Sequence, residues 1–230
     1  MKIIADISGN HGGYLEKAVE LIYTAAECGC HYAKFQYYTP REMYANEPSK
    51  ALYEQLHVPF EWLDSLFGAA TRTGIGLFAS VFSADAVGDL LPYDPDYYKI
   101  ASPKSTWLPK STYAAIAKAV PADRGLLISA CGRDMHDMWH HTGLFKGARN
   151  FLYCPVGHPQ HIGDADIDEF YKRGFYGFSD HTPGLIAPLA LAAAGANMIE
   201  KHLKLDDDCI DAHFSADART MATLVEHLDQ

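Results

Sequence analysis

Short apolar runs alternate with longer segments of helical periodicity along the whole chain. Each run is bounded by polar residues, Gly or Pro, a pattern typical of strands that are buried in a parallel sheet. Eight strands are predicted, at 2–7, 31–35, 75–80, 97–101, 125–129, 151–155, 174–178 and 197–201. Between them apolar residues recur every three or four positions, which predicts helices at 14–28, 60–72, 84–91, 108–119, 134–141 and 167–172, another within 183–199, and a last one capped by Ser215.

This order of elements predicts the fold class α/β and the architecture of a (β/α)₈ TIM barrel. Eight strand–helix units in 230 residues lie near the lower size limit of that fold, and residues 1–230 are expected to form one domain. The alternative is a doubly wound open sheet, but SGNHGG at 8–13 is a poor match to its glycine-rich dinucleotide turn. The long segment at about 37–59 is predicted to be a lid or binding loop.

Composition narrows the classes of partner. The net charge of −10 argues against a general nucleic-acid or anionic-membrane binder, although local lysines can still favour an anionic substrate. The five cysteines show no CxxC pair, which is typical of a reducing compartment. The N-terminal stretch MKIIADISGNHGG has no apolar segment of the signal-peptide type, and we expect a cytoplasmic protein.

Two histidines follow the last two predicted strands. His181 comes after FSD and His202 after IEK. Because the carboxyl ends of neighbouring parallel strands lie side by side, both imidazoles are expected in the same mouth of the barrel, within reach of one divalent metal ion. Two histidines with oxygen donors suit Mn²⁺, which is the ion we expect, and also Mg²⁺, Co²⁺ or Zn²⁺.

The other predicted strand ends carry lysines, hydroxyls and carboxylates. In a TIM barrel, groups at these positions form the active site. Lysines and hydroxyls next to a metal suit a small phosphorylated or carboxylated substrate. The polar residues at or just after the strand ends include Asp6, Lys34, Gln36, Ser80, Lys99, Ser102, Lys104, Ser129, His158, Ser179 and Glu200.

Several motifs resemble the N-acetylneuraminate (sialic acid) synthase family. They are ADISGNHGG at the N-terminus, KFQ at 34–36, YYKIAS at 97–102, FSDHTPG at 178–184, IEKH at 199–202 and DAHFS at 211–215. The match runs through the whole chain in order. The resemblance implies a TIM-barrel transferase of carbohydrate biosynthesis that condenses phosphoenolpyruvate (PEP) with a sugar aldehyde, uses a divalent metal and releases phosphate.

The resemblance also implies roles for individual residues. The resemblance implies that His181 and His202 bind the metal and that Gln36 and Asp211 contact the sugar. The PEP phosphate and carboxylate are assigned to Lys34, Ser80, Lys99, Ser102, Ser129 and Ser179. The catalytic set is then Asp6, Lys34, Lys99, His181 and His202.

The chain departs from the family pattern mainly where the acceptor sugar is held. Asp6 stands where the family usually has Glu, and Lys104 stands where a sugar-contacting Glu is usual. Val156 and His158 replace an Asn-x-Tyr motif, and the family's C-terminal antifreeze-like domain has no counterpart in these residues. We therefore count Lys104 and His158 as substrate-binding positions that have changed, and hypothesise a different acceptor, such as one with an anionic group facing Lys104.

Other functions compatible with the residues are a different metal-dependent barrel aldolase or isomerase, and a non-catalytic homologue that binds PEP and metal. The expected partners are small molecules and a second copy of the chain in a homodimer, without nucleic acid or membrane.

Overall fold

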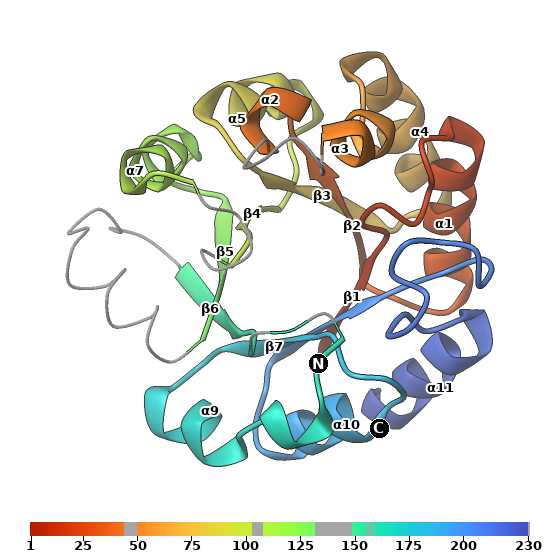
Figure 1. The fold of residues 1–230 in the computed structure, drawn as a ribbon, viewed down its shortest axis with the longest axis vertical. Helices are drawn as coiled ribbons and strands as arrows, with labels where there is room; N and C mark the ends of the chain where they lie inside the picture. The colour runs from red at the N-terminus through yellow and green to blue at the C-terminus, as the bar shows by residue number, and fades with distance from the viewer. Residues whose placement is uncertain (44–49, 103–107, 132–148, 156, 158, 230) are drawn as a thin grey trace.

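Eight parallel strands form a closed barrel in which each strand pairs with the next along the chain (Figure 1). The computed structural model describes residues 1–43, 50–102, 108–131, 149–155, 157 and 159–229. The strands are β1 (Lys2–Asp6), β2 (Tyr32–Tyr37), β3 (Gly76–Val81), β4 (Tyr97–Ile100), β5 (Gly125–Ala130), β6 (Arg149–Tyr153), β7 (Gly177–Asp180) and β8 (Met198–His202). The predicted TIM barrel is confirmed.

Helices surround this barrel and connect its strands (Figure 1). The α-helices in the described residues are α1 (Leu15–Glu27), α2 (Pro40–Met43), α3 (Lys50–Leu56), α4 (Leu63–Thr73), α5 (Ala84–Leu90), α7 (Lys110–Ala119), α9 (Ile167–Arg173), α10 (Ile186–Ala193) and α11 (Ala218–Leu228). Short 3₁₀ turns are η2 (Phe60–Trp62), η3 (Leu91–Tyr93) and η4 (Ile162–Asp164). The helix predicted at 134–141 lies outside the described residues.

The first and last strands close the barrel and set its register. Ile4 of β1 lies opposite Glu200 of β8, and Asp6 lies opposite His202. Side chains of a strand alternate between its two faces, so residues two apart share a face. The register therefore brings polar residues of β1 and β8 to one level inside the barrel, although about 195 positions separate them in the chain.

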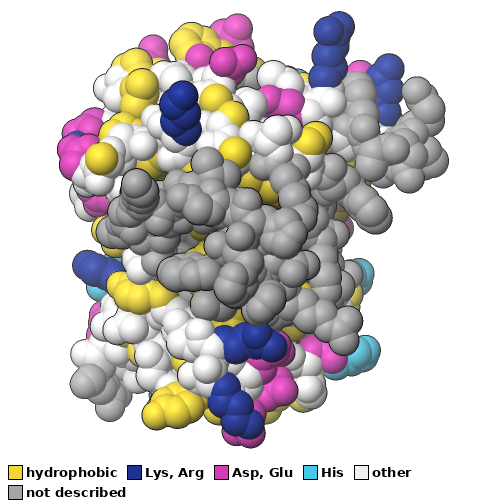
Figure 2. Space-filling model, turned by 90° about the vertical axis from the view of Figure 1, so that its left-hand side faces the viewer, with side chains coloured by type: hydrophobic (Ala, Val, Ile, Leu, Met, Phe, Trp, Pro, Cys, Tyr) yellow, Lys and Arg dark blue, Asp and Glu magenta, His cyan; other side chains and the backbone are white. Residues whose placement is uncertain are grey.

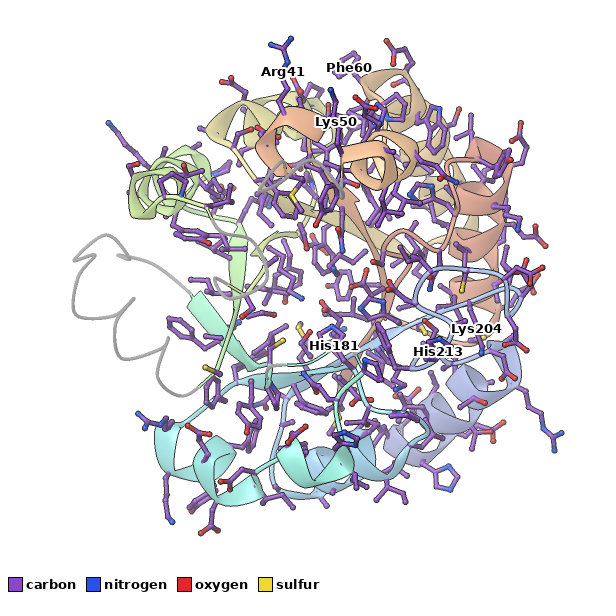
Figure 3. The ribbon with its side chains drawn as sticks, in the orientation of Figure 1. Arg41, Lys50, Phe60, His181, Lys204 and His213 are labelled. Carbon is purple, nitrogen blue, oxygen red and sulfur yellow. The ribbon has the colours of Figure 1, made fainter. Side chains whose placement is uncertain are left out.

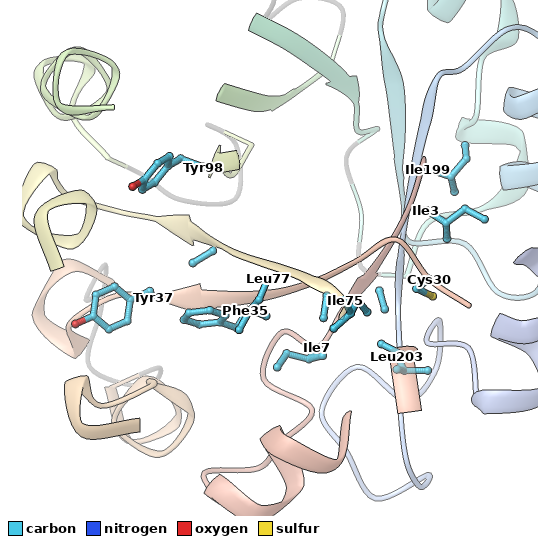
Figure 4. Packing of buried hydrophobic residues seen from close by; sticks show 14 of the residues in the cluster. Ile3, Ile7, Cys30, Phe35, Tyr37, Ile75, Leu77, Tyr98, Ile199 and Leu203 are labelled. Atoms are coloured by element: carbon cyan, nitrogen blue, oxygen red, sulfur yellow. The ribbon is translucent and has the colours of Figure 1, made fainter. Parts of the chain in front are cut away.

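Two apolar layers hold the barrel. The larger lies between the strands and the helices and includes Ile3, Phe35 and Ile199 (Figure 4). The smaller fills the lower part of the barrel interior and consists of Ile4, Phe78, Leu127, Leu152 and Met198, with Tyr32, Tyr97 and Tyr176 packed against it. This inner layer closes the barrel beneath the polar residues.

Some predicted boundaries were wrong. The strand predicted at 174–178 begins at Gly177, because Gly174 ends α9 in the left-handed conformation and two further residues complete the turn. His202 is the last residue of β8 and does not lie beyond it, since it still pairs with Asp6 of β1. The cap of the last helix is Asp217, whose carboxylate accepts the Thr220 N–H at 2.7 Å; Ser215 instead donates its hydroxyl hydrogen to the carbonyl of Asp211.

The outer surface carries ordinary ion pairs, and the cysteine side chains are buried or half-buried. Basic and acidic side chains lie next to one another over α9 (Figure 2), where Lys172 lies 2.8 Å from Asp168 and Arg173 lies 3.3 Å from Glu169. All five cysteines are free thiols. Among the described helices none has the length and apolar character needed to cross a membrane.

The aromatic rings at the bottom of the barrel need glycines on the neighbouring strands. A Cβ at Gly76 would lie 2.3 Å from a ring carbon of Tyr32, and one at Gly125 would lie 2.3 Å from a ring carbon of Tyr97. These distances are far below van der Waals contact. Glycine at both positions is therefore a packing requirement of the inner layer.

We expect Gly76→Ala to lower the free energy of unfolding by about 1–3 kcal/mol, because the Tyr32 ring must leave its position. Urea unfolding followed by circular dichroism measures this. The matched control is Gly88→Ala within α5, where a Cβ has no atom within 4 Å; alanine there should leave stability unchanged or raise it by about 1 kcal/mol. Equal stability of Gly76→Ala and the wild type would contradict the packing argument.

Candidate active site

A polar cavity of about 260 Å³ opens above the inner apolar layer, at the carboxyl ends of the strands. Eleven of the thirteen predicted site residues line it: Asp6, Lys34, Gln36, Ser80, Lys99, Ser102, Ser129, Ser179, His181, His202 and Asp211. The other two, Lys104 and His158, lie outside the described residues. The topology thus brings residues from seven strands or the loops that follow them to one place.

Two lysines and two carboxylates form the floor of this cavity. The Lys34 ammonium lies 2.7 Å from Asp6 Oδ2 and 3.9 Å from Glu200 Oε1, and Lys99 forms an ion pair with the same Glu200 oxygen. All four side chains are less than 5% exposed. The floor therefore holds two positive and two negative charges away from water, in mutual contact.

The pKa values of these groups follow from their contacts. Burial alone would raise the pKa of Glu200, but Lys34 and Lys99 lower it to about 2. Burial lowers the pKa of Lys34, yet Asp6 and Glu200 outweigh it and the net shift is upward. The pKa of Lys99 falls, because burial and the neighbouring Lys34 charge together outweigh Glu200. Glu200 is consequently a carboxylate at neutral pH.

Serine hydroxyls line the cavity next to the lysines. Ser80 accepts a hydrogen bond from Lys34 at 3.1 Å, and Ser179 donates to Glu200 at 2.8 Å. The buried Ser129 hydroxyl and the second oxygen of Glu200 have no hydrogen-bond partner among the described residues. Buried polar atoms are usually paired. A bound molecule that accepts from Ser129 would satisfy the first of these atoms.

His181 and His202 lie side by side at one wall of the cavity. Their ring centroids are 5.0 Å apart, and the edge of Phe214 packs against both. Asp211 Oδ2 lies 3.1 Å from His202 Nδ1, and Asp6 Oδ2 lies 3.4 Å from its Nε2. Burial lowers the pKa of His202, but the two carboxylates outweigh it and the pKa rises above the usual value.

The environment of His181 is different. Gln160 donates its backbone N–H to the His181 carbonyl at 3.0 Å, and its side-chain nitrogen lies 3.3 Å from Nδ1 of the imidazole. The Cys154 thiol lies 3.8 Å from the same nitrogen. His181 is thus oriented by the loop after β6, whereas His202 is oriented by carboxylates.

Asn10 joins the first loop of the barrel to the last. Its amide nitrogen donates to the Leu203 carbonyl at 2.8 Å and to the Ser215 hydroxyl at 3.0 Å, and its oxygen accepts the Asp211 N–H at 3.1 Å. Ser215 in turn donates to the Asp211 carbonyl at 2.7 Å. These bonds hold the loop after β8 in the conformation that brings Asp211 to His202.

The paired histidines are the residues that could hold a metal ion. Two adjacent imidazoles suit a divalent ion whose other positions are taken by water or substrate oxygens. Within the described part of the chain, no group of three or more His, Cys, Asp or Glu side chains is arranged to hold one.

Some cavity residues had no assigned role in the sequence prediction. Glu200 was recognisable as a polar strand end, and its spacing of two from His202 indicates the same face of β8. Cys154 is the first residue after β6. Ser8, Phe82 and Ala101 come shortly after β1, β3 and β4, and Met43 and Tyr53 come from the long segment after β2.

Two further histidines lie outside the cavity. His11 is buried against the edge of Trp62, and burial lowers its pKa to about 4, so that it is neutral. His213 is exposed in the loop before α11, away from the centre of the barrel where His181 lies (Figure 3). Neither lines the cavity.

A larger cavity, of about 620 Å³, lies at the amino ends of the first strands. Residues such as Lys2, Tyr32 and Gly76 line it. In a TIM barrel this end contributes to stability, and chemistry takes place at the opposite end. The lysines, serines and paired histidines all lie at that opposite end, which makes the smaller cavity the candidate active site.

Known proteins resemble this chain in sequence and in structure. The pseudaminic acid synthase of Helicobacter pylori (strain ATCC 700392 / 26695) is 30% identical over 100% of this chain and 74% of its own length. The pseudaminic acid synthase of Campylobacter jejuni subsp. jejuni serotype O:2 is 31% identical over 99% of this chain and 73% of its own length. A crystal structure of N-acetylneuraminic acid (sialic acid) synthetase from Leptospira borgpetersenii serovar Hardjo-bovis, in complex with citrate, superimposes with a TM-score of 0.89 at 26% identity, covering 99% of this chain and 82% of that one.

The same relationship appears at the level of the family. Residues 21–230 match the NeuB family, and this range contains both lysines of the cavity floor, the serines and the paired histidines. The relatives also align over nearly the entire chain, from the first strand to the last helix. This chain belongs to the NeuB family.

Proposed function

We propose that this chain is a transferase that condenses PEP with a sugar aldehyde and releases phosphate, giving a 2-keto sugar acid. The observation that supports it is the combination, in one cavity of a NeuB-family barrel, of two buried lysines, several serine hydroxyls and a histidine pair. The lysines and hydroxyls suit a small di- or trianion, and the histidines suit a metal beside it. The relatives named as pseudaminic and sialic acid synthases support the same reaction class.

PEP binds, in this proposal, over the lysine floor. Lys34 and Lys99 neutralise its phosphate and carboxylate and fix its orientation, and serine hydroxyls donate hydrogen bonds to its oxygens. Ser129 is well suited to this, since its buried hydroxyl has no partner among the described residues. Ser80, Ser102 and Ser179 line the same cavity and complete the anion-binding set.

Asp6 and Glu200 favour the charged form of the lysines they contact, and burial opposes it. Each carboxylate contacts at least one ammonium group, which offsets part of the cost of burying it. Asp6 also lies near His202 and links the anion-binding half of the cavity to the histidine half. A carboxylate at this position therefore orients two catalytic side chains at once.

His181 and His202 would hold the divalent ion, with Mn²⁺ as the expected ion and Mg²⁺, Co²⁺ or Zn²⁺ as alternatives. A metal ion bound there supplies a Lewis acid that polarises the aldehyde carbonyl of the acceptor. Asp211, whose carboxylate lies beside His202, and Gln36, which donates to Ser8 at 3.0 Å, lie where the acceptor sugar would bind.

The bonds change as follows. Carbon 3 of PEP bonds to the aldehyde carbon of the sugar, water adds at carbon 2, and phosphate leaves with cleavage of the C–O bond. The chain's residues contribute by bringing the two substrates into contact and by balancing the charge of the departing phosphate. Phosphate release that requires both PEP and an aldehyde separates this function from a metal-dependent aldolase or isomerase. Binding of PEP and metal without turnover across a broad acceptor panel would favour a non-catalytic homologue.

The identity of the acceptor is a separate proposal that rests on the sequence. Lys104 reverses the charge that the resembled family usually has at that position, and an acceptor with an anionic group would suit it. A panel of neutral and anionic sugar aldehydes, assayed with the wild type and with Lys104→Glu, tests this. Loss of the preference for anionic acceptors in the variant is expected, and an unchanged preference would contradict the proposal.

We expect Lys99→Met to weaken PEP binding roughly 10- to 100-fold, since a charge-assisted contact contributes about 1.5–3 kcal/mol. Isothermal titration calorimetry with PEP measures the affinity, and thermal unfolding shows whether the variant folds. Lys172→Met on the exposed surface of α9 is the matched control and should bind PEP like the wild type. Wild-type affinity in Lys99→Met would exclude the lysine floor as the PEP site.

We expect Mn²⁺ affinity to fall as the pH falls, because metal ligation needs neutral imidazoles. A free histidine titrates near ~6.5. The raised pKa of His202 means that it is protonated in the metal-free protein at a pH where a free histidine is already neutral. As the pH falls, the loss of Mn²⁺ affinity should therefore begin at a higher pH than the one at which a free histidine becomes protonated. Electron paramagnetic resonance of free Mn²⁺, recorded from mildly alkaline to mildly acidic pH, measures this.

The controls for the metal site are single histidine variants. His181→Ala and His202→Ala should each abolish tight Mn²⁺ binding, whereas His227→Ala, at an exposed position of α11, should not change it. Flat Mn²⁺ affinity across this pH range would contradict ligation by the histidine pair.

A further inference from the structure

A buried ion pair lies directly behind the two histidines. Asp180 of β7 lies opposite Lys201 of β8, one residue before His181 and His202 respectively. The alternation of side chains turns Ser179, Glu200 and the histidines toward the cavity, and it turns Asp180 and Lys201 away from it. Both side chains are completely buried. The pair therefore contacts no substrate directly.

The side chains of this pair form hydrogen bonds with the residue that follows His181. The Lys201 ammonium lies 2.7 Å from Asp180 Oδ2 and also donates to the carbonyl of Thr182. Asp180 Oδ1 accepts the Thr182 N–H at 2.9 Å and the Thr182 hydroxyl at 2.7 Å. The residues on both sides of His181 are thus tied to each other and to the residue that precedes His202.

Stability alone is a weak reason for this arrangement. Burying two charges costs solvation energy that their attraction repays only in part, and apolar residues of similar size often serve a core equally well. Burial lowers the pKa of Lys201, although Asp180 opposes the shift. What the pair supplies, and apolar residues do not, is a set of directional bonds between the end of β8 and the turn after β7.

We propose that Asp180, Thr182 and Lys201 are positioning residues that set the separation and orientation of His181 and His202, and thereby the affinity and geometry of the metal site. This inference rests on the proposed function, since it assumes that the two histidines bind a metal ion. We call Asp180, Thr182 and Lys201 the clamp. It acts through the backbone, because Lys201 and His202 are consecutive in β8, and Asp180 and Thr182 flank His181. Its loss would let the turn after β7 move relative to β8.

The test compares the wild type with the double variant Asp180→Asn/Lys201→Met, which removes both charges so that neither is left buried and unpaired. The full chain is stripped of metal with EDTA. Three quantities are measured: the melting temperature in EDTA, the Mn²⁺ dissociation constant by electron paramagnetic resonance, and the visible d–d spectrum of the Co²⁺-loaded protein. The last reports coordination geometry, which a purely structural role would not change.

We expect the double variant to melt within a few degrees of the wild type, to bind Mn²⁺ about 10–100-fold more weakly and to show a shifted Co²⁺ spectrum. The surface pair on α9 provides the matched control, Asp168→Asn/Lys172→Met, in which both metal readouts should equal those of the wild type. A folded Asp180→Asn/Lys201→Met variant with wild-type Mn²⁺ affinity and Co²⁺ spectrum would overturn the inference.

A second variant covers the case in which the double variant does not fold. Thr182→Val removes one hydroxyl contact with Asp180 and keeps both charges. Weaker Mn²⁺ binding with a shifted Co²⁺ spectrum supports the positioning role, and unchanged values overturn it. If the wild type binds no Mn²⁺, or binds it equally well after His181→Ala and His202→Ala, the metal site itself is refuted. That result is distinct from a failure of the clamp alone.

Discussion

The pairing of buried lysines with buried carboxylates is the constraint on which the rest of the site depends. An anion-binding pocket needs positive charge out of contact with water, and each isolated buried ion costs on the order of several kcal/mol. Here Asp6 contacts Lys34, and Glu200 contacts Lys99 and lies near Lys34, so the cavity floor is close to neutral before any ligand arrives. The carboxylates therefore offset part of the cost of burying the lysines without a substrate, and the lysines still line the cavity where a substrate would bind.

Strand geometry lets β7 and β8 serve two purposes at once. Every second side chain faces the cavity, and these side chains include Ser179, Glu200 and the two histidines. The side chains between them, Asp180 and Lys201, face the helices. The ends of these two strands thus carry the cavity residues on one face and the buried Asp180–Lys201 pair on the other. The motifs FSDHTPG and IEKH therefore each contain two interleaved sets of residues, one for each face of the sheet.

The part of the cavity lined by Asp211, Met43 and Tyr53 is built differently from the part lined by the lysines and serines. Lys34, Lys99 and the serines lie in or directly after regular strands, where register fixes their positions. Asp211 is held by a long loop whose shape depends on Asn10 in another loop, and Met43 and Tyr53 come from the segment after β2. Positions that depend on loops can change without disturbing the barrel. This fits a family in which the relatives are named for different sugar acids.

The sequence by itself determined the barrel, the strand-end residues and the histidine pair, because hydrophobic periodicity and strand order are local properties and parallel strands share one active end. It could not determine which polar side chains contact one another. The contacts of Lys99 with Glu200, of His202 with Asp211 and of Asn10 with Ser215 join positions about 10 to 200 residues apart. These contacts follow from barrel closure between β1 and β8 and from side-chain packing, which only the tertiary structure decided.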